Sequence, residues 1–260
     1  MQIISSKENT RVKQLKKLRD SAKYRRQSGL FIAEGLRVCC DAVYSGAHIQ
    51  TLYVTERALE KYTEKINEIV EKAEETLVLS GKVFVQVSDT LNSQGVLCTI
   101  KTLDKRLQFD TIKNSGKFLA LDNVQDPINL GTVLRSAEAF GVSGVILSAD
   151  CCDVYNPKVV RGSMGAVFRV PFLVCDTIAD FLSEHTELHS YAAVISADAK
   201  KITNIFFDEP CIAVIGNEGN GLRLETISAC QHQITIPMNG KAESLNASAA
   251  ATVIIWEMVR

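Results

Sequence analysis

CIAVIGNEGNGL (residues 211–222) joins five consecutive apolar residues directly to a loop that contains three glycines. An uninterrupted apolar run of this length is typical of a strand buried on both faces, as in a parallel sheet. Glycine lets the backbone that follows adopt positive φ and approach a ligand closely. The stretch therefore predicts a central strand that ends in a candidate ligand-binding loop.

Similar apolar runs flank this strand in the sequence, at 118–121, 144–147, 170–174, 191–195 and 233–236. Helix-length segments separate most of these runs, at 129–140, 156–164, 177–188 and 222–229. This alternation predicts an α/β fold with a parallel sheet covered by helices on both faces. Ligands of such sheets lie where loops leave the carboxyl ends of the strands, so we expect chemistry after residues 121, 215 and 236.

The first of these loops lies in LDNVQDPINLGTVLR (residues 121–135), where a polar stretch with a proline precedes a helical pattern. The helix is expected to start near Asn129, and asparagine is also a common helix cap. Arg135 lies within the second turn after Asn129. Capping and surface exposure are thus ordinary structural alternatives to a functional role for these two residues.

The second loop has the glycine spacing G-x-x-G-x-G over residues 216–221. This spacing differs from the dinucleotide fingerprint G-x-G-x-x-G, and the sequence contains no phosphate-binding G-x-x-x-x-G-K-[ST] motif. A dehydrogenase or a kinase-like enzyme is therefore disfavoured. Glu218 would repel a pyrophosphate, so a neutral or cationic ligand suits this loop better, unless the turn binds no ligand at all.

The third loop, IPMNGKAESLNAS (residues 236–248), follows the last apolar run. Ser244 is expected to cap the final helix, whose amino-terminal turn could bind a carboxylate. Leu245, Ala249, Val253 and Trp256 recur at helical spacing and are expected to dock this helix on the sheet.

The amino-terminal part of the chain predicts a second, smaller α/β unit. Strands are expected at 30–33, 49–54, 83–87 and 97–100, and helices at 36–45 and 56–75. The predicted organisation is a domain at 1–105, a polar linker at 106–116 and a larger domain at 117–260.

Positive charge is concentrated at the amino terminus. Residues 1–37 contain ten Lys and Arg but three Asp and Glu, whereas residues 111–260 contain 11 basic and 16 acidic side chains. The basic residues accompany a helical apolar stripe formed by Val12, Leu15 and Leu18. Such a helix is a solvated face, a nucleic-acid contact or, less suitably because the stripe lacks Trp and Phe, a membrane-surface helix.

Composition excludes several classes. With 46% hydrophobic and 23% charged residues, the chain is neither disordered nor collagenous. The sequence shows no run of the ~18 apolar residues that span a bilayer, and its start lacks the apolar core of a signal peptide. The eight cysteines lack the C-x-x-C spacing of zinc sites. We therefore expect free thiols, no metal, no membrane association and a cytoplasmic location.

The three loops together resemble the signature motifs of the SpoU (TrmH-like) branch of the SPOUT RNA methyltransferases. NLGTVLR (residues 129–135) is similar to the first motif, GNEGNG (216–221) to the second, and IPM with ESLN (236–238 and 243–246) to the third. FIAEG (31–35), followed by Arg37, resembles the start of this family's ribosomal-protein-like substrate-binding domain.

The resemblance implies a ribose 2′-O-methyltransferase that uses S-adenosyl-L-methionine, with a trefoil-knotted catalytic domain, acting as a homodimer. Its implied catalytic residues are Arg135, Asn129 and Glu218. We expect Arg135 to organise the ribose and a phosphate rather than act as a base, because a guanidinium resists deprotonation. The implied cofactor-binding residues are Gly216, Asn217, Gly219, Gly221, Ile236, Met238, Ser244, Leu245 and Asn246.

Structured RNA is the implied partner. The expected RNA-binding residues are Lys13, Lys16, Lys17, Arg19 and Arg37. The basic leader is more similar to that of members acting on ribosomal RNA, so 23S-type rRNA is favoured as substrate. A tRNA 2′-O-methyltransferase and a non-enzymatic RNA-binding protein on the same scaffold remain the alternatives.

Overall fold

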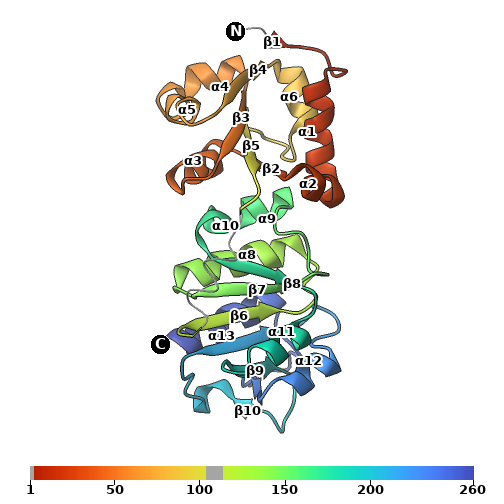
Figure 1. Cartoon of the computed structure of the whole chain (residues 1–260), viewed down its shortest axis with the longest axis vertical. Coiled ribbons are helices and arrows are strands. Elements are labelled where there is room, and N and C mark those ends of the chain that lie inside the picture. The colour runs from red at the N-terminus through yellow and green to blue at the C-terminus, as the bar shows by residue number, and fades with distance from the viewer. Residues whose placement is uncertain (1–2, 104–113) are drawn as a thin grey trace. The chain divides into compact units, whose positions relative to one another are not determined.

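The computed structural model describes residues 3–103 and 114–260, which fall into two compact units (Figure 1). The first unit contains residues 3–103 together with 153–168, and the second contains 114–152 together with 169–260. Most of the predicted linker, at 106–113, lies outside the described residues. The domain boundaries expected from the sequence stay a prediction.

The second unit contains a seven-stranded, all-parallel sheet with the order β10-β12-β9-β11-β6-β7-β8. Its strands are β6 (Lys117–Leu121), β7 (Gly144–Ser148), β8 (Phe172–Cys175), β9 (His189–Ala193), β10 (Lys200–Lys201), β11 (Cys211–Ile215) and β12 (His232–Thr235). The predicted parallel sheet is confirmed. Ile215 pairs with Leu121, so the first two candidate loops start side by side. The trefoil knot is not tested by the strand order and stays a prediction.

Helices cover this sheet as expected. The helices α8 (Pro127–Ala139) and α13 (Ala247–Val259) pack on each other, and α13 contacts β6 and β11. The helices α11 (Ile178–Glu184) and α12 (Leu224–Ala229) also pack together. One buried cluster joins Phe118 and Val214 of the strands to Phe181 of α11. The short helix η1 (Ile202–Asn204) follows β10.

The structure excludes the capping alternative for Asn129, and the predicted cap at Ser244 is wrong. The side chain of Asp126 accepts the Ile128 N–H and Pro127 occupies the first turn, so α8 begins before Asn129. A fixed φ and a missing N–H suit proline to this position. At α13, Asn246 rather than Ser244 caps the helix, because its side chain accepts the N–H groups of Ser248 and Ala249.

The predicted docking face of α13 is also wrong. Leu245, Val253 and Trp256 are 40%, 39% and 54% exposed, and Ala249 is exposed as well. The residues that contact the sheet side are instead Ala247, Ala251, Ile254, Ile255 and Met258, all buried. The small side chains of Ala247 and Ala251 let α13 approach the sheet closely. The apolar side chains of Leu245, Val253 and Trp256 are left exposed in the protomer.

The first unit contains a five-stranded mixed sheet with the order β1-β4-β3-β5-β2. Its strands are β1 (Ile3–Ile4), β2 (Leu30–Glu34), β3 (Ile49–Val54), β4 (Glu75–Leu79) and β5 (Val96–Lys101). The expected strands at 30–33, 49–54 and 97–100 are confirmed by β2, β3 and β5.

Two other expectations for this unit are wrong. Residues 83–87 lie in the helix α6 (Gly81–Val87), because Val83, Phe84 and Val87 form a helical face that packs beside α1. The helix expected at 56–75 is divided into α4 (Glu56–Lys61) and α5 (Thr63–Val70), after which the unexpected strand β4 starts.

The basic leader forms α1 (Thr10–Asp20) and α2 (Ala22–Ser28), which precede β2 and α3 (Leu36–Tyr44). Val12, Leu15 and Leu18 are at most 2% exposed and belong to the core. The apolar stripe of the leader thus packs inward, and its basic residues remain on the outer faces except for the buried Arg25.

Residues 153–168, which include α9 (Pro157–Gly162) and most of α10 (Ala166–Arg169), belong to the first unit although they connect β7 to β8. The rings of Tyr155 and Phe31 stack with centroids 4.5 Å apart. Arg25, which is 3% exposed, pairs with Asp153 at 2.7 Å. We call residues 153–168 the β7–β8 arm.

Within the described residues, no helix has the length and apolar character required to cross a membrane. The eight cysteines are all described and all are free thiols, as expected.

Candidate functional site

The three candidate loops are joined at the carboxyl end of the parallel sheet by a hydrogen-bonded chain of Asn129, Glu218 and Asn246. The Asn129 amide nitrogen donates to the Glu218 carboxylate at 3.0 Å. The Asn246 amide nitrogen donates to the Asn129 side-chain oxygen at 2.9 Å. Each of the three loops therefore contributes one residue to this hydrogen-bonded chain.

Glu218 is the centre of this chain. Its carboxylate also accepts the backbone N–H groups of Gln125 at 3.1 Å and Asp126 at 3.0 Å. Partial burial raises the pKa of Glu218, but the hydrogen bonds from Asn129 and from backbone N–H groups lower it more. The net pKa lies below the ordinary glutamate value, so Glu218 is ionised at neutral pH.

Asn129 contributes from inside α8. Because Asp126 caps the helix, the Asn129 side chain is released from capping; it is 4% exposed and bonded on both its oxygen and its nitrogen. Asn246 uses its own oxygen for the cap of α13 and its nitrogen for Asn129. The cap of one helix and the first turn of another are thus fixed to each other.

The loop after β11 is a closed hairpin. The backbones of Asn217 and Gly221 exchange two hydrogen bonds of 3.0 Å, and Gly221 has φ +67°. The Asn217 side-chain oxygen accepts the N–H of Gly219 at 3.0 Å, and its nitrogen donates to the Asn123 carbonyl at 2.8 Å. A Cβ at Gly216 would lie 2.2 Å from the Gly221 carbonyl carbon, so residue 216 admits no side chain.

The outer side of this hairpin is open. A Cβ at Gly219 would meet only the Asn217 side-chain oxygen at 3.7 Å, and one at Gly221 would meet nothing within 4 Å. Gly219 does not adopt positive φ, whereas Gly221 does. Gly216 and Gly219 therefore have different roles: close chain packing for Gly216, and open space for Gly219.

The third loop, at 236–246, has no regular secondary structure. Ile236 is half-buried where the loop leaves β12, and Ser244 is exposed. Met238 and Leu245 present apolar side chains that are 38% and 40% exposed. Among the described residues, the backbone of 237–245 forms no hydrogen bond with another backbone group, so its polar groups are available to water or a ligand.

Arg135 lies apart from the Glu218 chain. It is exposed on α8, and the described residues show no hydrogen bond or ion pair to it. Six residues separate it from Asn129, which is about 9 Å along a helix and about 240° around it. The two side chains therefore leave α8 in different directions, and their joint action in catalysis stays a prediction.

The predicted RNA-binding residues on α1 differ in their availability. Arg19 pairs with Asp20 at 2.7 Å and donates to the carbonyl oxygens of Gln86 and Ser88 at 2.9 and 3.2 Å. Its guanidinium thus joins α1 to the carboxyl end of α6, and the Arg19 side chain is 23% exposed. Arg19 is the least available of the set for a phosphate.

The other members of the set are more accessible. Lys13 forms an exposed ion pair with Glu8, and the Lys16 ammonium donates to the Gln86 side chain. Lys17 lies over the ring of Tyr24 at 5.6 Å. Arg37 is exposed in the first turn of α3, a different element. These contacts lie at the surface, and RNA binding by these residues stays a prediction.

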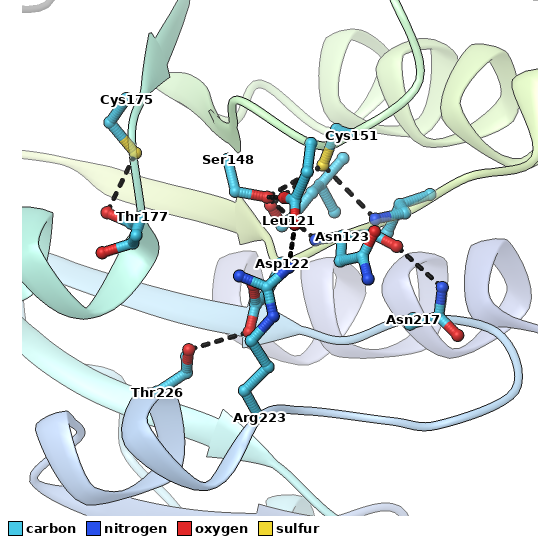
Figure 2. Close-up of polar contacts among 12 residues, drawn as sticks. Leu121, Asp122, Asn123, Ser148, Cys151, Cys175, Thr177, Asn217, Arg223 and Thr226 are labelled. Carbon is cyan, nitrogen blue, oxygen red and sulfur yellow. Dashed lines mark hydrogen bonds and ion pairs between the residues drawn. The ribbon is translucent and has the colours of Figure 1, made fainter.

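Sequence reasoning missed a second polar cluster next to the glycine hairpin (Figure 2). Arg223, directly before α12, reaches the carboxylate of Asp122. Its guanidinium also pairs with Asp150. Thr226 donates to Asp122 at 2.8 Å. The only sequence signal was position: Asp122 directly follows β6, and Arg223 directly follows the glycine loop.

Among the described residues, no group of three or more His, Cys, Asp or Glu side chains is arranged to hold a metal ion.

Comparison with known proteins identifies the family. Residues 116–256 match the SpoU rRNA methylase family, and residues 9–98 match the MRM3-like substrate binding domain. An uncharacterized tRNA/rRNA methyltransferase of Synechocystis is 32% identical over 258 residues, which is 99% of this chain and 93% of that protein. The 23S rRNA guanosine 2′-O-methyltransferase RlmP of Bacillus subtilis is 26% identical over 99% of both chains.

A solved structure agrees with these matches. An AdoMet-bound rRNA methyltransferase from Sinorhizobium meliloti has a TM-score of 0.86 and 28% identity, covering 98% of this chain and 96% of that one. The matched region includes all three candidate loops, and the match extends through both units. The chain belongs to the SpoU rRNA methylase family.

Proposed function

We propose that this protein methylates a ribose 2′-hydroxyl of 23S-type ribosomal RNA with S-adenosylmethionine as methyl donor. Family membership supports the reaction, and the similarity to RlmP supports the RNA class. The Sinorhizobium structure, described as AdoMet-bound, supports the cofactor. The observation that carries the proposal is the Asn129–Glu218–Asn246 chain, which joins the three family motifs at one edge of the sheet.

The residues present fit the cofactor. The open side of Gly219 and Gly221 admits a ligand against the backbone, and no cationic side chain lies in 216–221 to repel a sulfonium. Met238 and Leu245 offer exposed apolar surface for the adenine ring of the cofactor, and the backbone of 237–245 offers polar groups that can hydrogen-bond to it. We assign cofactor binding to these two loops. When bound, the cofactor supplies a methyl group on a positively charged sulfur.

Glu218 is best suited to a fixed electrostatic role. Its lowered pKa makes it a weak base, and its four hydrogen-bond donors leave the carboxylate little freedom to move. Its negative charge is already oriented at neutral pH. Groups that are arranged in advance in this way stabilise charge in an active site without reorganising during the reaction. Asn129 holds Glu218 and Asn246, and so maintains the spacing between the loops.

Arg135 remains the proposed organiser of the RNA. A guanidinium can hold a phosphate through two parallel hydrogen bonds and stabilise negative charge that develops on the 2′-oxygen. Holding the two reactants in line can supply ~7–11 kcal/mol of the barrier in well-oriented systems. This contribution reduces what a separate base must do.

The finer proposal for assembly is a homodimer formed through α8 and α13. Exposed Ile128 of α8, at 65%, and Val253 and Trp256 of α13 lie on two helices that pack on each other. The ring of Trp256 contacts only Phe140 edge-on among described aromatic residues. A second copy of this chain would cover apolar surface that is otherwise exposed to water. Arg135 is also exposed on α8, one of these two helices.

The first unit is the proposed RNA-binding unit, because residues 9–98 match a substrate-binding domain and α1 presents lysines at the surface. We also propose a cytoplasmic location, which agrees with the eight free thiols and with a ribosomal substrate.

The direct test is methyl transfer from labelled S-adenosylmethionine to 23S rRNA fragments and to tRNA, followed by mapping of 2′-O-methyl positions. We expect label on the rRNA and none on tRNA. Arg135→Ala should abolish transfer while cofactor affinity changes by less than a few-fold. Label on tRNA alone would favour the alternative substrate, and RNA binding without transfer would favour the non-enzymatic alternative.

A further inference from the structure

The polar cluster in Figure 2 is built around a buried carboxylate. Asp122, the residue after β6, is 1% exposed. One of its oxygens accepts the Thr226 hydroxyl at 2.8 Å, and the other lies 3.5 Å from the Arg223 guanidinium without a hydrogen bond. A buried charge is costly unless it is paired, so Asp122 depends on both neighbours.

Arg223 extends the cluster to the next strand. Its guanidinium also pairs with Asp150, whose carboxylate accepts the Ser148 hydroxyl at 2.6 Å. The Ser148 oxygen in turn accepts the Asn123 N–H at 2.9 Å. A single arginine thus connects the ends of β6 and β7 with the start of α12.

Both ends of the glycine hairpin are attached to this cluster. Before the hairpin, the Ile215 carbonyl accepts the Asp122 N–H at 2.8 Å; after it, Arg223 follows Leu222 in the chain. The residues between them, from Glu218 to Gly221, are exposed and have no core packing of their own. The shape of the hairpin is therefore set from its two ends.

The cluster also holds the hairpin's lateral contact. Asn123 has φ +58°, an unusual conformation for a residue other than glycine, and its carbonyl accepts the Asn217 amide. Ser148 fixes the N–H of this same residue. Strained backbone of this kind persists where surrounding contacts impose it.

We propose that Asp122, Arg223 and Thr226 are positioning residues that hold the 216–221 hairpin in the shape required for cofactor binding. The inference rests on the proposed assignment of this hairpin to the cofactor. Arg223 acts through the hairpin, since its own contacts are with Asp122 and Asp150. Loss of the cluster should therefore weaken binding of S-adenosylmethionine more than it slows methyl transfer at saturation.

The test compares Arg223→Gln, Arg223→Lys and Thr226→Val in the full chain. Cofactor affinity is measured by calorimetry, and KM for S-adenosylmethionine and kcat are measured on rRNA. Removing a charge-assisted contact should raise Kd and KM about tenfold or more in Arg223→Gln, with kcat changed much less. Arg223→Lys should recover part of the affinity, and Thr226→Val should show a smaller loss.

The matched control is Arg169→Gln, because Arg169 also forms an ion pair, with Glu138, in the same unit but outside the cluster. It should bind the cofactor like the wild type. If Arg223→Gln does not fold, the charge-balanced double variant Asp122→Asn/Arg223→Gln takes its place. Thr226→Val then provides the independent single substitution in the cluster.

Two outcomes would overturn the inference: unchanged affinity in folded Arg223→Gln, or activity that falls only with the folded fraction while KM stays constant. Failure of the wild-type protein to bind S-adenosylmethionine would instead contradict the proposed function. The two failures are thus distinguishable.

Discussion

At the scale of single residues, the glycines of the second loop illustrate how similar letters serve different purposes. Gly216 is required by a close chain crossing, Gly221 by positive φ, and Gly219 by neither. The sequence pattern predicts that the loop needs glycine, but it does not distinguish these causes.

The first prediction follows from this difference. Gly216→Ala should lose cofactor binding, because its Cβ would overlap the Gly221 carbonyl, which is backbone and cannot rotate away. Gly219→Ala should fold normally and lose at most a few-fold in affinity, since its Cβ enters open space. Calorimetry with S-adenosylmethionine compares the two. Equal losses would mean that the ligand, and not the chain crossing, sets the requirement.

Glu218 carries the second prediction. Its pKa is lowered, so its contribution to folding stability is complete above the usual glutamate range of ~4.3 and is lost as the pH falls through the lower folded pKa. Glu218→Gln should remove this part of the acid dependence and lower kcat/KM by about 10–100-fold, the value of about one charge-assisted hydrogen bond. Thermal unfolding from pH 7 to pH 3 and steady-state kinetics test the two statements. Parallel acid profiles for the variant and the wild type would contradict the first.

At the scale of elements, the β7–β8 arm shows how a segment can belong to a unit distant in sequence. Arg25 pairs with Asp153 of the arm and donates to the carbonyl oxygens of Leu18 and Arg19 at 2.6 and 3.0 Å. Arg161 of the arm pairs with Asp89 at 3.0 Å. These contacts attach the arm to α2 and to the segment that follows α6.

The third prediction concerns this attachment. Arg25→Met should destabilise the first unit by about 3–5 kcal/mol, because it removes the buried guanidinium that pairs with the Asp153 carboxylate and binds two backbone carbonyl oxygens. Lys13→Met, which breaks an exposed pair, should cost about 0–1 kcal/mol. Urea unfolding followed separately for the two units measures both. A loss confined to the second unit would contradict the assignment of the arm.

The helix α1 carries the fourth prediction. Lys13→Gln with Lys17→Gln should reduce the salt dependence of RNA binding by about 0.7–0.9 per lost phosphate contact, roughly equally for all RNA sequences. Arg19→Gln should instead lower stability, because Arg19 already binds backbone carbonyls of its own unit. Affinity measured from low to moderate salt decides the matter. An unchanged slope in the double lysine variant would make α1 a solvated face.

At the scale of the whole molecule, the second unit is not a continuous stretch of chain. Residues 153–168 leave it between β7 and β8 and belong to the first unit. Deletion of residues 1–103 or 1–110 would therefore remove Arg25 and Phe31, which contact Asp153 and Tyr155. Point substitutions are therefore the better way to separate RNA capture from cofactor binding.

The fifth prediction concerns assembly. Trp256→Glu should convert a dimer into monomers, because it would place a charge on the uncovered stripe of α13. Phe206→Glu is the matched control, since Phe206 is 83% exposed in the same unit but lies outside α8 and α13. Light scattering after size exclusion gives the mass of each variant. A wild-type monomer, or a dimer that survives Trp256→Glu, would contradict this interface.

The sequence by itself determined the parallel sheet, the three loops at its carboxyl edge and the inward stripe of α1, because these depend on local periodicity and on turn residues. The tertiary structure decided what depends on neighbours. Val83–Val87 is a short apolar run like that of a strand but forms a helix, since α1 offers a face to pack against. The helix α13 has two apolar stripes, and only contact with β6 and β11 selects the buried one. Asp122 and Arg223, 101 positions apart, become partners only when their strand and helix meet.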